Sequence, residues 1–177
     1  MPHDLRSLVR SIPDYPKAGI LFRDITTLIE HAEGFRQTIE ELAAPYRAQG
    51  LTHVAGIEAR GFIFGAAIAV NLEVGFVPLR KKGKLPGNTI GQNYALEYGA
   101  DTIEIHDDVL SAGHKVLVCD DLIATGGTAI AAVQLLRRTG ATVEDACFVI
   151  DLFDLGGAQK LREMGVKVFK LIDFEGH

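Results

Sequence analysis

The chain has 177 residues, a length that suits one domain with a sizeable buried core. Its composition is that of an ordinary globular protein, and its net charge of −5 argues against an overall basic surface of the kind that binds nucleic acid. No apolar run approaches the length of a membrane span, and the first residues lack the basic and apolar segments of a signal peptide. We therefore expect a cytoplasmic protein with neither a membrane nor a nucleic acid as partner.

The N-terminal part is predicted to contain two helices separated by irregular chain. Apolar residues at helical spacing indicate a short amphipathic helix over residues 4–12. Pro13 and Pro16 end it, and residues 13–27 are expected to form an irregular lead-in. A second helix is predicted over residues 33–48.

From residue 53 onward, the pattern alternates between strand and helix. The predicted strands are 53–57, 75–79, 101–106, 116–119, 146–152 and 168–172, and the predicted helices are 61–72, 127–138 and 156–164. This alternation predicts a single α/β domain over 1–177, with a doubly wound, mostly parallel sheet and helices on both faces. Residues 81–95 are polar and aperiodic, so we expect a long functional loop there.

The cysteines and histidines give no sign of a protein-borne metal site. Cys119 and Cys147 lie in apolar segments, which predicts buried free thiols, and the six histidines show no ligand spacing.

The segment from Val116 to Ala129 joins an apolar strand, two carboxylates and a glycine turn that enters a helix. Backbone N–H groups at such a turn form an anion site, to which Thr125 and Thr128 can add hydroxyl donors. Asp120 and Asp121 would repel a phosphate, but they can accept hydrogen bonds from a vicinal diol. The segment therefore predicts a ribose 5-phosphate site, and its ordinary alternative is a glycine turn beside two solvated acids.

Two further stretches carry cations suited to phosphate groups. Arg60 follows the 53–57 strand and precedes a glycine at a helix start, where its planar fork matches a phosphate. Residues 80–87 place four cations within five residues at the start of the long loop. The ordinary alternatives are that Arg60 forms a surface salt bridge with Glu58 and that the basic run is a solvated surface.

The 116–129 string resembles the phosphoribosyl pyrophosphate (PRPP) signature of the type I phosphoribosyltransferases. Residues 19–25, 58–62, 80–87 and 96–99 further resemble the adenine-specific members of that family, in the family's order and over nearly the whole chain. Two features are less usual there, namely Glu58, where an aspartate is common, and the loop centre from Asn88 to Asn93. Neither removes a functional side chain.

The resemblance implies a role for each matching position. The implied residues are Ala124, Thr125, Gly126, Gly127 and Thr128 for the 5-phosphate; Asp120 and Asp121 for the ribose; Glu58, Ala59, Arg60, Arg80, Lys81 and Lys84 for pyrophosphate; Leu21, Phe22, Arg23 and Leu155 for adenine; and Glu97 as catalytic acid or base. It also implies a cis peptide bond at Glu58-Ala59, an N-terminal base-binding hood over 1–32 and a mobile loop over 81–95. Without the resemblance, Phe22 would be an ordinary core residue and Glu97 a surface carboxylate.

The implied activity is transfer of the 5-phosphoribosyl group from PRPP to adenine, giving AMP and pyrophosphate in purine salvage. The resemblance implies a homodimer and Mg²⁺, which would be held mainly through PRPP and water.

Two alternatives remain. One is a transferase for another base, such as hypoxanthine, guanine, xanthine or orotate, which residues 22–23 and 96–99 disfavour. The other is a non-catalytic PRPP-sensing regulator that binds DNA, which the lack of a basic face disfavours.

Overall fold

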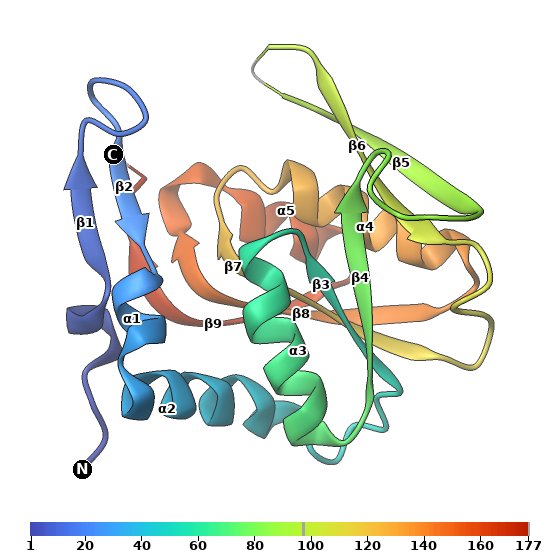
Figure 1. The fold of residues 1–177 in the computed structure, drawn as a ribbon, viewed down its shortest axis with the longest axis horizontal. Coiled ribbons are helices and arrows are strands. Elements are labelled where there is room, and N and C mark those ends of the chain that lie inside the picture. Colours follow the sequence, from blue (N-terminus) through green and yellow to red (C-terminus); the bar gives the residue numbers. More distant parts are fainter. Residues whose placement is uncertain (97, 177) are drawn as a thin grey trace.

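The structure is a computed structural model that describes residues 1–96 and 98–176. Within these residues, a seven-stranded sheet has the strand order β5-β6-β4-β3-β7-β8-β9, and a separate two-stranded hairpin joins β1 and β2. Figure 1 shows this hairpin at one side of the molecule and the β5–β6 hairpin at the other.

The bounds of the elements largely follow the sequence prediction after residue 53. The strands are β1 (Arg10–Pro13), β2 (Leu21–Asp24), β3 (His53–Ile57), β4 (Gly75–Lys81), β5 (Thr89–Ala95), β6 (Ala100–His106), β7 (Lys115–Ile123), β8 (Thr142–Leu152) and β9 (Lys167–Phe174). The helices are α1 (Thr26–Glu30), α2 (Ala32–Ala43), α3 (Arg60–Leu72), α4 (Gly127–Arg138) and α5 (Gly157–Glu163), with short 3-10 turns η1 (Leu5–Leu8), η2 (Ala44–Tyr46) and η3 (Phe153–Leu155).

The central strands are parallel, as predicted. β3 pairs in parallel with β4 and β7, β7 with β8, and β8 with β9, while β6 runs antiparallel to β4 and β5. The predicted doubly wound, mostly parallel sheet is therefore confirmed.

Helices cover both faces of the sheet and define two cores. Because side chains alternate along β7, Leu117 and Cys119 pack with α2 and α3, whereas Val116 and Val118 pack with α4 and α5. Figure 1 shows α2 and α3 in front of the sheet, with α4 and α5 behind it. Cys119 and Cys147 are buried free thiols, as expected.

The predicted helix over 4–12 is wrong. Only η1 forms there, and Arg10 to Pro13 instead pair antiparallel with Leu21 to Asp24, inside the lead-in that was expected to be irregular. Four apolar residues cannot hold an isolated helix, because helix nucleation is costly, and the hairpin ladder satisfies the backbone better. The Arg10–Asp24 ion pair, at 2.5 Å, joins the two strands.

The long loop predicted over 81–95 is shorter than expected. Residues 89–95 form β5, which pairs with β6 from Thr89↔His106 to Ala95↔Ala100, so only residues 82–88 connect β4 to β5. Ile90 and Tyr94 pack on the core beneath α4, but the polar Gln92 between them concealed the strand alternation in the sequence. Arg138 on α4 donates hydrogen bonds to the Gly91 carbonyl and to Gln92.

No helix in the described part of the chain is both long enough and apolar enough to cross a bilayer.

Candidate active site

The carboxyl ends of β3, β4 and β7 meet at one edge of the sheet, where three adjoining cavities lie. A cavity of about 300 Å³ lies over the turn at 124–128, a central one of about 450 Å³ adjoins it, and one of about 300 Å³ lies under the β1–β2 hairpin. Asp120, Tyr94 and Thr128 line both of the first two, and Arg60 lines both the central and the hairpin cavity. A single extended ligand can therefore span all three.

The first cavity is bounded by the predicted phosphate turn, Ala124 to Thr128. Gly126 precedes α4 at φ +90°, a left-handed conformation that favours glycine, so the first N–H groups of α4 can face an anion. Gly157 at the start of α5 supports the turn from behind, where its N–H donates to the Ala124 carbonyl at 3.0 Å. Lys160 adds a bond to the Thr125 carbonyl at 3.2 Å.

The two adjacent aspartates have different surroundings because they are consecutive residues of β7, whose side chains alternate. The strand runs on to Ile123, beyond the predicted end at 119. Asp121 is buried, pairs with Arg60 Nε at 2.6 Å and lines the central cavity, while half-buried Asp120 lines both the first and the central cavity. Burial and the neighbouring Asp121 carboxylate raise the pKa of Asp120. Asp120 is thus the carboxylate better placed for a ribose hydroxyl.

Arg60 does not pair with Glu58, the partner that the sequence alone suggested. Burial by itself would lower the pKa of Arg60, but Asp121, with smaller contributions from Asp120 and Asp24, outweighs burial and raises the pKa. The guanidinium thus stays charged, fixed through Nε, with its remaining donors near the central cavity. The neighbouring Gly61 leaves room for Asp120, because a Cβ there would lie 2.8 Å from Asp120 Oδ1.

The Glu58-Ala59 peptide bond is cis, as the resemblance implied. The Glu58 side chain turns toward the basic run: it accepts hydrogen bonds from Arg80 Nε at 3.2 Å, the Lys81 N–H at 3.1 Å and Lys84 Nζ at 2.7 Å. Burial alone would raise the pKa of Glu58, but these partners lower it, Lys84 most of all. Three of the residues assigned to pyrophosphate are therefore brought together around a carboxylate.

Tyr94 and Asp101 line the central cavity but were not predicted from the sequence. Tyr94 donates through its hydroxyl to Asp101 Oδ2 at 3.2 Å, and Lys81 Nζ lies 3.7 Å from the same oxygen. No short motif contains this pair; only the period-two spacing of Ile90 and Tyr94 could have indicated that Tyr94 faces inward.

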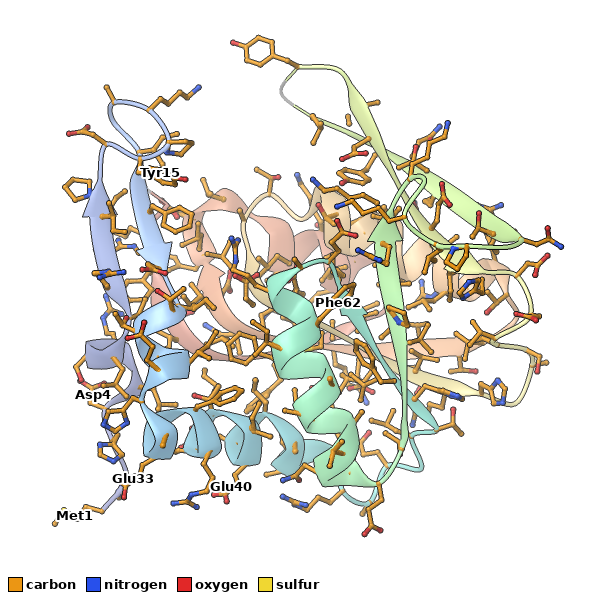
Figure 2. The ribbon with its side chains drawn as sticks, in the orientation of Figure 1. Met1, Asp4, Tyr15, Glu33, Glu40 and Phe62 are labelled. Atoms are coloured by element: carbon orange, nitrogen blue, oxygen red, sulfur yellow. The ribbon has the colours of Figure 1, made fainter. Side chains whose placement is uncertain are left out.

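The hairpin cavity is lined mainly by residues of the N-terminal hood, which are Ile12, Tyr15, Phe22, Arg23, Asp24, Ile25 and Thr26, together with Arg60. Tyr15, in the connection between β1 and β2 (Figure 2), packs edge-on against Phe22 with ring centroids 5.2 Å apart. The Arg60 guanidinium lies 5.8 Å from the centre of the Phe22 ring, on the side of the central cavity. Phe22 is only partly buried, so it is available to a planar ligand.

Of the three other residues assigned to the base, only Arg23 lines this cavity, and its side chain is held elsewhere. Arg23 extends its side chain toward the C-terminal end, donating to Ser11 Oγ at 2.6 Å with its guanidinium 4.3 Å over the Phe174 ring. Leu21 and Leu155 are not among the residues that line the hairpin cavity. Glu97 falls outside the described residues.

The residues 26–177 match the family model described as the phosphoribosyl transferase domain. The chain is 59% identical over 175 residues to the adenine phosphoribosyltransferase of Rhodopseudomonas palustris, covering 99% of this chain and 88% of that protein. It is 61% identical over 173 residues to the Methylobacterium radiotolerans enzyme, covering 98% and 96%. The chain belongs to the adenine phosphoribosyltransferase family.

Solved structures of that family share the fold. The Thermoanaerobacter pseudethanolicus adenine phosphoribosyltransferase superposes with a TM-score of 0.92 at 44% identity, covering 97% of this chain and 98% of that one. The Saccharomyces cerevisiae enzyme, solved with adenine and an imino-altritol bisphosphate, gives a TM-score of 0.88 at 37% identity, covering 95% and 96%.

We predict that Gly157→Ala disturbs the phosphate turn specifically. A Cβ at Gly157 would lie 2.5 Å from the Ala124 carbonyl oxygen and 2.8 Å from the Gly126 nitrogen, so the turn must shift. Ribose 5-phosphate binding, measured by calorimetry, should weaken by about tenfold, the order expected when one charge-assisted hydrogen bond is lost. Gly50→Ala is the control: Gly50 is remote from the turn and a Cβ there would meet no atom within 4 Å, and because φ at Gly50 is +70° the substitution should lower stability alone. Unchanged ribose 5-phosphate affinity in Gly157→Ala would contradict the assignment of the turn.

Proposed function

We propose that the protein transfers the 5-phosphoribosyl group of PRPP to adenine, giving AMP and pyrophosphate. The observation that carries the proposal is the run of three adjoining cavities, which offer an anion turn, a carboxylate beside clustered cations, and an aromatic hood. These match in order a 5-phosphate, a ribose with its diphosphate, and a base. The identity of about 60% to adenine phosphoribosyltransferases supports the same reaction.

The phosphate turn and Asp120 would hold the sugar. The N–H groups at the start of α4, with the Thr125 and Thr128 hydroxyls, would bind the 5-phosphate. Asp120 would accept hydrogen bonds from the ribose hydroxyls, while Asp121 keeps Arg60 in place. The anomeric carbon would then lie in the central cavity, near the clustered cations.

In the reaction, N9 of adenine forms a bond to C1 of the ribose as the bond from C1 to pyrophosphate breaks. Charge develops on the departing oxygens, so fixed cations lower the barrier. Arg60, Arg80, Lys81 and Lys84 would supply them from three neighbouring segments. Adenine loses a proton as N9 bonds, and Glu97 is our candidate to accept it or to hold the reactive tautomer.

Mg²⁺ fits this site only as a partner of the substrate. Among residues 1–96 and 98–176, no group of three or more histidine, cysteine, aspartate or glutamate side chains could hold a metal. Mg²⁺ commonly binds through one or two carboxylates, phosphates and water, and Asp120 faces the central cavity where a diphosphate would lie. The ion would offset charge on the diphosphate.

The hood would select the base. Phe22 would cover the adenine ring, and backbone groups near Leu21 and Arg23 would read its edge. Adenine offers an amino donor at C6, where hypoxanthine offers an acceptor, so a backbone carbonyl would leave the wrong base with a buried unpaired group.

We also propose that the protein is a homodimer. Helix α3 is apolar nearly all round, and Ile63 and Val70 remain exposed on its outer side at 41% and 79%. A second copy of this surface would cover both side chains. Light scattering at graded concentrations should give twice the mass of 19.2 kDa, and Val70→Lys should shift the mass toward the monomer. A monomer throughout would reject the proposal.

The activity is tested by incubating the protein with PRPP and Mg²⁺ and each of adenine, hypoxanthine, guanine and orotate. We expect AMP and pyrophosphate from adenine and far less nucleotide from the other bases. A preference for another base would favour the first alternative, and PRPP binding without turnover would favour the regulator.

Asp120→Asn should weaken PRPP binding by roughly 1.5–3 kcal/mol, the cost of a charge-assisted hydrogen bond, and leave adenine binding nearly unchanged. Asp121→Asn should cause a loss of similar size, but because it frees Arg60 it should also weaken binding of inorganic pyrophosphate. Separate titrations with each ligand test both variants. An equal loss for PRPP and adenine would count against the ribose assignment.

Phe22→Ala should raise the KM for adenine by an amount equivalent to roughly 1–3 kcal/mol, the scale of base–aromatic stacking, and leave the KM for PRPP nearly unchanged. Preference for adenine over hypoxanthine should survive, because the backbone carbonyl remains. Tyr15→Phe is the matched control, since it keeps the edge-on ring and removes only a hydroxyl. If steady-state kinetics show an unchanged KM for adenine in Phe22→Ala, the base binds elsewhere and the assignment of Phe22 is wrong.

A further inference from the structure

Glu58 is a buried carboxylate at the place where a diphosphate is expected to bind. Its side chain is only 7% exposed, yet its partners, Arg80 and Lys84, are cations that we assign to pyrophosphate. A carboxylate and a diphosphate cannot share these cations without competing for them, since each neutralises the same charge. The contact therefore affects how tightly the site binds its anionic ligand.

The two oxygens of Glu58 have different partners. Oε1 accepts from Arg80 Nε and from the Lys81 N–H, both on β4. Oε2 accepts from Lys84 Nζ, which belongs to the 82–88 connection. One oxygen thus binds the sheet, and the other binds the segment expected to be mobile.

Glu58 itself has little freedom to move with the ligand. Its N–H donates to the Leu79 carbonyl at 3.0 Å, which fixes its backbone to the neighbouring strand. Lys84 is half-exposed, with a side chain long enough to leave Oε2. Arg80, held through Nε, keeps its Nη donors, of which Nη1 also reaches the Lys84 carbonyl at 3.4 Å.

We infer that Glu58 is the resting counter-ion of Lys84, and that a bound diphosphate takes Lys84 from it while Arg80 stays attached to Glu58. The inference rests on the proposed function for its ligand. The ion pair holds the 82–88 connection against the cis peptide loop in the free protein. It also weakens diphosphate binding, because the ligand must break this pair, and so it favours release of the product.

Glu58→Gln separates the two oxygens. The amide oxygen can still accept from Arg80 and Lys81, while an NH₂ group replaces the acceptor for Lys84. We expect calorimetry with pyrophosphate and Mg²⁺ to show tighter binding by about two- to fivefold, the factor that corresponds to a partly exposed ion pair. Hydrogen exchange at residues 82–88 of the free protein should become faster.

Two controls isolate the ion pair. Glu104→Gln removes a carboxylate beside the same connection, where Glu104 accepts from the Gly83 N–H at 3.3 Å and from Thr89 Oγ1 at 2.8 Å, so any general effect of charge will appear there too. It should leave pyrophosphate affinity nearly unchanged. Lys84→Gln should weaken pyrophosphate binding. Adding Glu58→Gln to Lys84→Gln should not increase the affinity for pyrophosphate, because the ion pair is already absent.

Glu58→Asp provides a second variant should Glu58→Gln fail to fold. It keeps the charge but withdraws it by one methylene from Lys84, so it should also tighten pyrophosphate binding. Weaker binding in either variant, or a gain that persists when Lys84 is absent, would overturn the inference. If the unsubstituted protein forms no AMP, the proposed function fails; if it forms AMP but Glu58→Gln gives no gain, only this inference fails.

Discussion

The parallel pairing of β3 with β4 on one side and with β7 on the other is the constraint on which the site depends. The registers Ile57↔Leu79 and Gly56↔Cys119 bring three strand ends to the same edge. The groups assigned to the sugar and the diphosphate lie in the last residues of these strands or shortly after them. The buried core protects the hydrogen bonds of the sheet from water. These bonds therefore hold in place charged side chains that would otherwise repel one another or adopt many conformations.

The four cations assigned to pyrophosphate are each paired with a carboxylate before any ligand binds. Arg60 forms an ion pair with Asp121, Arg80 and Lys84 form ion pairs with Glu58, and Lys81 lies near Asp101. A cluster of cations without counter-ions would destabilise the fold, since like charges repel in a partly buried site. On the proposals above, diphosphate binding is an exchange of partners in which Lys84 leaves Glu58, while Arg60 stays paired with Asp121 and Arg80 with Glu58.

The sequence predicted the parallel sheet and the glycine turn before α4 well, because both depend on local patterns: apolar runs and a glycine turn before a helix. It could not predict that Asp120 and Asp121 have different surroundings, since that depends on which face of β7 each occupies. Nor could it find β1 and β5, which are short or polar strands that form only because a partner strand supplies their hydrogen bonds. The Glu58 contacts join residues 22 to 26 positions apart, beyond the range of any local pattern.

The central claim is that one ligand spans the three cavities, with its phosphate on the 124–128 turn and its base under the hood. Amide NMR shifts test it most directly, with ribose 5-phosphate and adenine added separately and then AMP. We expect ribose 5-phosphate to shift residues 124–128 but not 19–25, adenine to do the reverse, and AMP to shift both sets. If adenine and ribose 5-phosphate shift the same residues, or AMP leaves either set unchanged, the account is contradicted.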